Sequence, residues 1–223
     1  MSDADADRRH SRALEPELIQ DPTLKAEAEA ANGLRQYDLA VQAVLAAIER
    51  HPFRLRVSLI LSLHRAALQG ISAYAGNWRP GDVEIQHSKH QPPGAHLVPE
   101  LVEDMCEYVN ENWEKADVSP VHLAAYVMWR LNWIHPFADG NGRTSRILSF
   151  FVLFTRLGAI LPGTPTLPDL IIDHRKMYEE ALDAADEAWR ENRLDVSKME
   201  SLIEGLLAKQ LARVYELAAG RSV

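Results

Sequence analysis

The chain has 223 residues, of which 47% are hydrophobic and 25% are charged, and its net charge at pH 7 is −8. These proportions exclude wholesale disorder and suit one large domain with its own core. An acidic balance also argues against nucleic acid as a partner, because phosphate binding along a polyanion needs clustered Lys and Arg. The overall charge leaves room for a local basic site.

The single cysteine, Cys106, excludes a disulfide framework and a zinc site with several cysteine ligands. It lies in an amphipathic run, where we expect a small core residue. The N-terminal residues contain no apolar secretory segment. The most apolar stretch, residues 147–157, is too short to span a bilayer. The sequence therefore predicts a cytoplasmic protein with no membrane partner.

Most of the chain has the periodicity of helices. Residues 1–21 are charged and aperiodic, and we expect a flexible N-terminal arm. Beyond it, apolar residues recur at helical spacing between Pro and Gly breaks. The expected helices cover residues 22–33, 38–50, 53–69, 99–113, 121–134, 143–157, 171–189 and 197–219.

Residues 71–98 interrupt this pattern with prolines and glycines. Within them, residues 82–86 alternate apolar and polar, which predicts a short strand and half of a hairpin. The segments 121–134 and 143–157 are apolar nearly all round, as is typical of central helices. The fold class is therefore all-α, one helical bundle with a small β-hairpin.

A polar segment separates these two apolar helices. It reads His135-Pro136-Phe137-Ala138-Asp139-Gly140-Asn141-Gly142-Arg143-Thr144-Ser145-Arg146. Glycines that lead into a helix can turn several N–H groups into one concavity, and a helix start favours an anion such as phosphate. Cations there oppose the helix dipole, so Arg143 and Arg146 indicate a ligand with more than one phosphate.

Two further residues complete this arrangement. Asp139 beside a phosphate site would repel it unless a cation bridges them, and Mg²⁺ is the natural bridge. His135 ends the preceding helix, and its neutral imidazole could accept a proton near pH 7. Taken singly, each of these features has an ordinary structural interpretation as a turn, a solvated face or a structural histidine. Together they describe transfer of a phosphorus-containing group to a hydroxyl.

The segment resembles the signature of the Fic family, His-Pro-Phe-x-Asp-Gly-Asn-Gly-Arg-x-x-Arg, at every fixed position. The resemblance implies a helical bundle with a β-hairpin flap. It also implies transfer of AMP from Mg-ATP to a Ser, Thr or Tyr hydroxyl of a protein target, or of the chain itself. His135 would be the base, Asp139 would hold Mg²⁺, and Phe137 would anchor the loop in the core. Gly140, Asn141, Gly142, Arg143 and Arg146 would bind the phosphates.

The family pattern divides the chain into three parts: an arm over residues 1–21, a catalytic domain over 22–190, and a C-terminal helix over 191–223 packed on the core. The flap would dock the target strand through Val83, Glu84, Ile85, Gln86 and His87, although an ordinary hairpin would have the same sequence. Tyr178 and Asp186 lie where the family lines its nucleoside pocket, and plain core packing is the alternative for Tyr178. A zinc site at His87, His90 and His96 is disfavoured by their irregular spacing.

Many family members carry an inhibitory helix, Ser/Thr-x-x-x-Glu-Gly/Asn, whose Glu pairs with the second signature arginine, here Arg146. Residues 22–33 lie where such a helix would precede the core. One register gives Glu27, followed by Ala28 where Gly or Asn is expected. A second register ends on Asn32 and has Ala31 in place of the Glu. We favour the second, because Asn32-Gly33 is a natural helix end; a simple packing helix is the alternative.

Rival hypotheses remain. The same fold could transfer UMP, phosphate or phosphocholine, or remove AMP. A non-catalytic nucleotide-binding module is disfavoured, because such a module needs no base at His135. The expected partners are ATP and a protein with an exposed hydroxyl, and a homo-oligomer is left open. The target itself cannot be inferred from a flap that pairs through backbone bonds.

Overall fold

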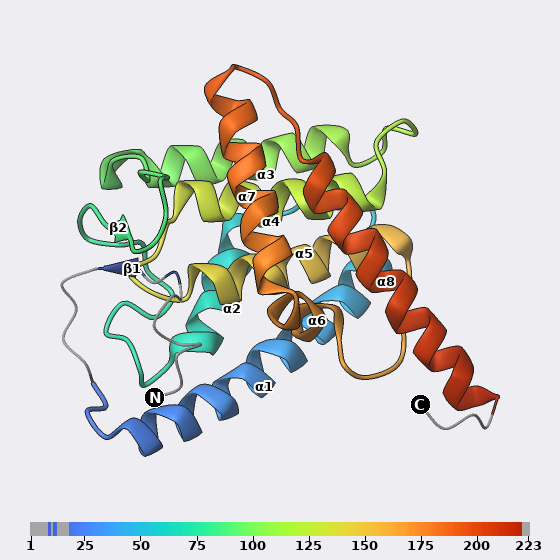
Figure 1. Cartoon of the computed structure of the whole chain (residues 1–223), viewed down its shortest axis with the longest axis horizontal. Coiled ribbons are helices and arrows are strands. Elements are labelled where there is room, and N and C mark those ends of the chain that lie inside the picture. Colours follow the sequence, from blue (N-terminus) through green and yellow to red (C-terminus); the bar gives the residue numbers. More distant parts are fainter. Residues whose placement is uncertain (1–8, 10, 13–17, 220–223) are drawn as a thin grey trace.

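The computed structural model describes residue 9, residues 11–12 and residues 18–219 (Figure 1). Most of the predicted arm over 1–21 lies outside the described residues. The helices are α1 (Pro22–Ile48), α2 (Val57–Leu68), α3 (Val98–Asn112), α4 (Pro120–Ile134), α5 (Asn141–Leu157), α6 (Leu167–Asp173), α7 (Arg175–Arg190) and α8 (Ser197–Ala218). A short 3₁₀ turn covers Ala95–Leu97, and the strands are β1 (Ser11–Arg12) and β2 (Glu84–Ile85). The all-α prediction is confirmed.

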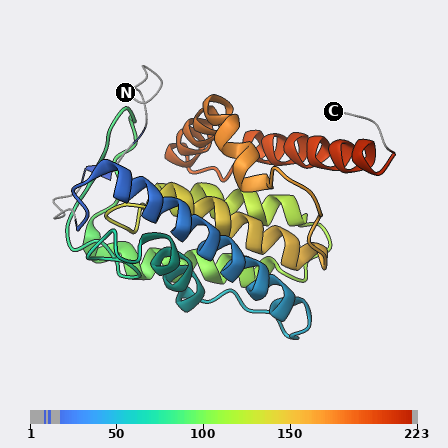
Figure 2. The same cartoon turned by 90° about the horizontal axis from the view of Figure 1, so that it is seen from below.

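The centre of the molecule is the pair α4 and α5, as their all-round apolar sequences predict. Nearly every residue of α4 from Leu123 to Leu131 is buried, and so are residues 147–155 of α5. Figure 2 shows α7 and α8 on one side of this pair and α2 on the other. Burying two neighbouring helices on all sides fixes the loop that joins them, which is the signature segment.

Helix α1 is longer than predicted, and the expected helix end at Asn32-Gly33 is wrong. Its buried residues are Asn32, Gln36, Ala40 and Val44, one continuous stripe at helical spacing. Asn32 Nδ2 donates to the Gln69 carbonyl at 2.8 Å, and Gln36 Nε2 donates to the Leu63 carbonyl at 3.0 Å. These tertiary bonds hold the helix onto α2 and carry it through Gly33, whose helix-breaking tendency is only about 1 kcal/mol.

The predicted hairpin is also corrected. Strand β2 pairs antiparallel with β1, with Ser11 opposite Ile85 and Arg12 opposite Glu84. Among the described residues, the segment after β2 supplies no partner strand. The chain turns at His87, which has a positive φ of 59°, and then enters Pro92 and Pro93, which have no N–H to donate. Figure 1 shows β1 beside β2 at one end of the bundle.

Two helix boundaries differ from the prediction for local reasons. The helix expected from residue 53 begins at Val57, because the Leu55 backbone is held extended by the Asn110 side chain through bonds of 2.7 and 3.1 Å. The helix expected over 171–189 is two helices that meet at His174, whose Nδ1 lies 2.8 Å from the Leu170 carbonyl.

The C-terminal helix α8 packs across α4, α6 and α7 through Met199, Leu202, Ile203 and Leu206. Glu200 also approaches His122 Nδ1 at 2.6 Å, and the Tyr108 hydroxyl lies 2.9 Å from His122 Nε2. This polar chain joins α3, α4 and α8. No helix in the described part of the chain is long and apolar enough to cross a membrane.

Candidate active site

The signature segment forms the turn between α4 and α5 and lines a cavity of about 690 Å³. Asn132, His135 and Gly142 belong to its wall, as do Arg143 and Arg146. Cavities of this size hold small organic ligands. The structure thus brings the predicted base, the glycine turn and both arginines to one concave surface at the N-terminus of α5.

The turn is braced from inside by Asn141. Its Oδ1 accepts from the Phe137 N–H at 2.9 Å, and its Nδ2 donates to the Phe137 carbonyl at 2.8 Å. Phe137 itself is fully buried and stacks on His64. The Asn141 side chain is therefore engaged by the loop, so its contribution to phosphate binding would come from its backbone.

Gly140 is required by both conformation and space. Its φ is +78°, which side chains rarely tolerate. A Cβ there would also lie 2.5 Å from Leu68 Cδ2 of α2. The close approach to α2 fixes the turn against the bundle. A side chain at this position would therefore strain the backbone and force Leu68 or the turn to shift.

His135 caps α4 in a left-handed conformation, with φ 53° and ψ 56°. It is buried, and burial lowers its pKa to about 4. Its Nδ1 lies 3.2 Å from the Asn132 carbonyl. Because a carbonyl can only accept, this contact favours the tautomer with the proton on Nδ1 and the lone pair on Nε2. The ring is thus neutral at pH 7 and has a basic nitrogen to offer.

Arg79 holds the backbone of His135 in place, and sequence reasoning missed it. Its Nε donates to the His135 carbonyl at 2.9 Å, and its backbone N–H donates to the Pro136 carbonyl at 2.9 Å. Other guanidinium nitrogens donate to the carbonyls of Gly81 and Pro93. One buried arginine therefore ties the strained histidine to the loops around β2. An arginine within a Pro/Gly-rich stretch carries no local signal of this role.

His64 of α2 braces the next part of the turn and was also missed. The Gly76 N–H donates to its Nδ1 at 2.9 Å, so Nδ1 carries the lone pair and Nε2 carries the proton. That Nε2 donates to the Asp139 carbonyl at 2.9 Å. The ring is 1% exposed, and burial lowers its pKa to about 4. A histidine on the otherwise apolar face of the predicted helix 53–69 was the signal available in the sequence.

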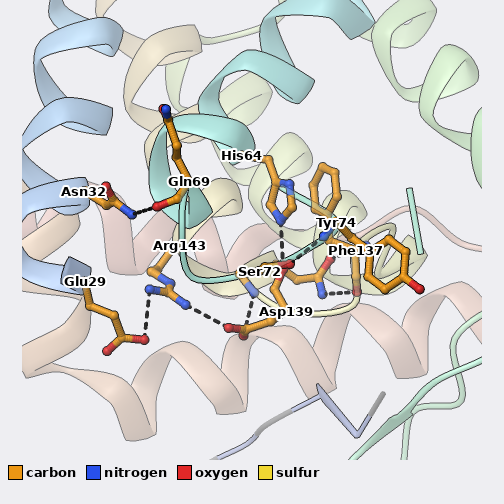
Figure 3. A network of polar contacts seen from close by, with 11 residues as sticks. Glu29, Asn32, His64, Gln69, Ser72, Tyr74, Phe137, Asp139 and Arg143 are labelled. Atoms are coloured by element: carbon orange, nitrogen blue, oxygen red, sulfur yellow. Dashed lines mark hydrogen bonds and ion pairs between the residues drawn. The ribbon is translucent and has the colours of Figure 1, made fainter. Parts of the chain in front are cut away.

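Asp139, Arg143 and Glu29 form a chain of charges at the cavity rim (Figure 3). Arg143 lies 2.9 Å from the Asp139 carboxylate and 3.4 Å from the Glu29 carboxylate of α1. The other Asp139 oxygen accepts from the Gly140 N–H. Arg143 is thus flanked by two carboxylates, that of Asp139 from its own turn and that of Glu29 from α1.

Neither of the two positions predicted for an inhibitory glutamate lines the cavity. Glu27 and Ala31 are exposed, whereas Glu29 and Lys25 line the cavity. Positions 25, 29, 32, 36, 40 and 44 follow one face of α1 at steps of three or four residues, and positions 27 and 31 lie off that face. Sequence reasoning missed this face because it ended the first helix at Gly33. It therefore did not continue the buried stripe of residues 40 and 44 toward the N-terminus.

Helix α7 also borders the cavity, through Tyr178 and Asp186 among other residues. The Tyr178 hydroxyl accepts from Asn132 Nδ2 at 2.8 Å, and Asp186 accepts from Trp129 Nε1 at 2.8 Å. Asp186 also lies 3.7 Å from His90 Nδ1, and burial raises its pKa. These two residues join α7 to α4 besides facing the cavity.

The five residues predicted for the flap differ in burial and in whether they line the cavity. Ile85 lines the cavity, Val83 is buried, and Glu84 and His87 are exposed. Gln86 is half-buried. Beyond the predicted set, Ser88 and His90 also reach the cavity wall. The segment therefore borders the site, with one predicted side chain turned to it.

The residues present suit Mg²⁺ bound with a nucleotide. Within the described residues, no group of three or more His, Cys, Asp or Glu side chains could hold a metal ion by itself. Asp139 nevertheless offers a solvent-accessible carboxylate beside the anion-favouring start of α5. Mg²⁺ is commonly held by one or two carboxylates, substrate phosphates and water, so this donor set fits the ion.

Residues 54–153 match the model of the Fic/DOC family. The chain therefore contains a Fic/DOC domain, which confirms the resemblance carried by the signature segment. Similar curated proteins include "Protein adenylyltransferase Fic" of Drosophila persimilis, 33% identical over 118 residues, which are 52% of this chain and 22% of that protein. The counterpart in Drosophila virilis is 33% identical over 120 residues, 52% of this chain and 24% of that protein. The alignment thus spans under a quarter of these relatives' length.

Solved structures show the same fold. A Fic domain containing signaling protein from Bacteroides thetaiotaomicron superposes with a TM-score of 0.70 at 21% identity, covering 92% of this chain and 78% of that chain. Fic-1 from C. elegans gives 0.63 at 22% identity, covering 88% and 54%. BepC from Bartonella tribocorum, solved with bound AMPPNP, gives 0.53 at 16% identity, covering 84% and 88%.

Proposed function

We propose that the chain is a protein adenylyltransferase, which transfers AMP from Mg-ATP to a Ser, Thr or Tyr hydroxyl of a protein. The observation that carries the proposal is the shared cavity. A buried, neutral histidine with its lone pair on Nε2 lines the same wall as a glycine turn at a helix start and two arginines. The names of the Drosophila relatives and the nucleotide analogue bound to BepC agree with this chemistry.

In the proposed reaction, the target hydroxyl attacks the α-phosphorus of ATP. His135 Nε2 accepts the hydroxyl proton, and pyrophosphate leaves. The N–H groups at the start of α5, with Arg143 and Arg146, would stabilise the charge on the phosphates. Asp139 would hold Mg²⁺, which neutralises phosphate charge when bound. Tyr178 and Asp186 on α7 would flank the nucleoside.

We further propose that Glu29 restrains this activity. Its carboxylate lies 3.4 Å from Arg143, an arginine that the phosphates need. A carboxylate that neutralises this arginine weakens its attraction for the nucleotide and repels the phosphate charge. The sequence pattern assigned a restraining glutamate to position 27 or 31 and paired it with Arg146. The proposal instead assigns the restraint to Glu29, paired with Arg143.

The flap segment around β2 would guide the acceptor. Glu84–Ile85 pairs with Ser11–Arg12 of the same chain, and this pairing supports the proposal that the edge can take a strand. Ile85 lines the cavity, so a strand bound there would run along the cavity mouth. Backbone pairing of this kind accepts many sequences, so a variety of protein segments could be presented to the base.

The test uses ATP labelled at the α- or the γ-phosphate, with Mg²⁺ and a protein extract as acceptor. Transfer of the α label, and its loss in His135→Ala, is the expected result. The matched control is His96→Ala, because His96 is exposed and away from the cavity wall. Transfer of the γ label would replace the proposal with phosphorylation. Nucleotide binding without transfer, unchanged in His135→Ala, would leave a binding module.

A further inference from the structure

The edge of β2 is occupied in the structure by the chain's own N-terminal segment. Strand β1, Ser11–Arg12, pairs antiparallel with Glu84–Ile85, and residue 11 lies opposite Ile85. Ile85 lines the cavity that also contains the signature turn. The described residues 9, 11 and 12 therefore lie where an acceptor strand would pair with β2. Their contacts indicate what else such a strand would meet.

Arg9 connects this segment to α7. Its Nη2 donates to both carboxylate oxygens of Asp183, at 2.9 and 2.8 Å, and its Nε lies 3.9 Å from a carboxylate oxygen of Glu179. The Arg9 side chain is 18% exposed. Arg9 and Glu179 both line the cavity. The strand paired with β2 is thus also bound, two residues earlier, by two carboxylates from a different element.

The two anchors differ in what they select. Backbone pairing along β2 accepts many sequences. Glu179 and Asp183, in contrast, lie four residues apart on one face of α7 with no basic residue between them, so together they attract a cation. A guanidinium can direct several N–H groups to two acceptors, whereas an ammonium is a single point charge on a flexible stem. This pair of carboxylates therefore suits arginine better than lysine.

We infer that Glu179 and Asp183 form a subsite for an arginine of the acceptor protein, and that Arg9 fills it while no acceptor is bound. The inference rests on the proposed adenylyl transfer and narrows its substrates. An acceptor segment would carry Arg two residues before the residue that pairs with Ile85. It would have to displace β1, because one edge of a strand cannot pair with two strands at once.

The test is an NMR titration of the isotope-labelled full-length Arg9→Ala variant with a synthetic peptide of residues 7–14. Loss of the Arg9 side chain should free the edge of β2 more often, and the peptide should then shift the amide signals of Ile85 and Asp183 together. Arg9→Ala in the peptide should raise its Kd by about three- to tenfold, the effect of losing a charge-assisted pair. Arg9→Lys in the peptide should raise the Kd less. Arg8→Ala in the peptide, which removes the same charge one residue earlier, should change the Kd by less than about twofold.

Variants of the subsite supply the matched control. In the chain that carries Arg9→Ala together with Glu179→Gln and Asp183→Asn, the native peptide and its Arg9→Ala form should bind with the same Kd. Glu180→Gln, at an exposed glutamate next to the subsite, should preserve the difference between the two peptides.

Three results would overturn the inference: equal Kd values for the two peptides on the Arg9→Ala chain, a difference that persists without the two carboxylates, or no shift at Ile85 and Asp183. Arg9 would then serve only to anchor the N-terminal segment. Peptide binding needs no catalysis, so a failure to transfer the α label would refute the proposed function and leave the outcome of the titration standing. Where extract proteins do receive the α label, Arg should be enriched at one fixed position before the modified hydroxyl.

Discussion

The turn between α4 and α5 and the outer rim of the same cavity are held in different ways. The turn is fixed by buried groups: Asn141 brackets Phe137, His64 holds the Asp139 carbonyl, and Arg79 holds the His135 carbonyl. The rim is held by accessible charges, such as Arg143 with Glu29, and by a two-residue ladder between β1 and β2.

Buried hydrogen bonds in the turn and accessible ion pairs at the rim suit different tasks, the first a fixed geometry and the second the exchange of ligands. Buried hydrogen bonds without competing water keep one geometry, and losing a partner is costly. Exposed ion pairs contribute about 0–1 kcal/mol and exchange readily with other ligands. A site arranged in this way would keep the proposed base and anion-binding turn in one geometry while the proposed acceptor and restraint at the rim exchange. Changes in the turn should therefore have large effects, and changes at the rim should be small and selective.

The largest effect is expected from His64→Leu. It leaves the Gly76 N–H and the Asp139 carbonyl without their buried partner, which should lower the free energy of unfolding by about 2–4 kcal/mol. The displaced turn should lower kcat by at least about tenfold, with a smaller change in KM for ATP. Urea unfolding and steady-state kinetics measure the two quantities.

His64→Gln supplies one donor and one acceptor, so it should recover part of kcat. His96→Leu, at an exposed histidine, is the matched control. An unchanged kcat in His64→Leu, at a temperature where the variant is folded, would show that His64 stabilises the bundle without positioning the turn.

The pH dependence of stability tests the same buried turn. Native His64 and His135 each have a pKa of about 4, against about 6.5 in an unfolded chain. Between these values the unfolded state binds more protons, so stability should fall as the pH is lowered from about 6.5 to 4. The largest loss in the free energy of unfolding over this range is on the order of 3 kcal/mol for each histidine.

Comparing the native sequence with a histidine variant separates the contribution of that histidine to the pH dependence of stability from the contributions of other titrating groups. Burial raises the pKa of Asp186, so protonation of that carboxylate on acidification has the opposite sign. Urea unfolding of the native sequence and His135→Gln at pH 7.5, 6.5, 5.5 and 4.5 should show a shallower loss in the variant. Parallel curves would mean that His135 accepts protons in the folded state with its ordinary pKa.

The sequence predicted most of the bundle and the whole signature turn. The helical spacing of apolar residues indicated where the long helices lie, because burial of their apolar faces is what stabilises these helices. The turn was recognisable because a polar, glycine-containing segment is unusual between two helices that are apolar on nearly all sides. Cys106, expected in the core, is buried there.

The features that the sequence did not predict depend on contacts between residues far apart in the chain. Gly33 would end an isolated helix, but Asn32 and Gln36 bond to α2 and carry α1 onward, so the carboxylate that α1 brings to Arg143 is that of Glu29. The partner of β2 lies more than seventy residues earlier in the chain, at β1, where no local pattern could indicate it. Arg79 acts through backbone carbonyls, which have no sequence signature.

At the rim, Glu29→Gln should raise adenylyl transfer by about three- to tenfold. The change removes one of the two carboxylates that flank Arg143 and leaves that arginine for the nucleotide. The free energy of unfolding should shift by no more than about 0.5 kcal/mol, because the pair is partly exposed. Glu27→Gln is the matched control, since residue 27 faces away from the cavity. Equal activation by both variants would show that net charge, and not the contact with Arg143, is responsible.

The smallest effect is expected at the outermost contact. Arg9→Ala should leave the free energy of unfolding within about 0.5 kcal/mol of the native value, because β1 docks on a bundle that is complete without it. The amides of β2 should nevertheless exchange with solvent about three- to tenfold faster, since β1 should leave β2 more often once the nearby ion pair of Arg9 with Asp183 is gone. Hydrogen exchange of Arg9→Ala and Arg8→Ala, followed by mass spectrometry, measures this. Exchange that stays the same at β2 but rises in the α4–α5 turn would mean that the rim supports the turn, and the two regions would then be one cooperative unit.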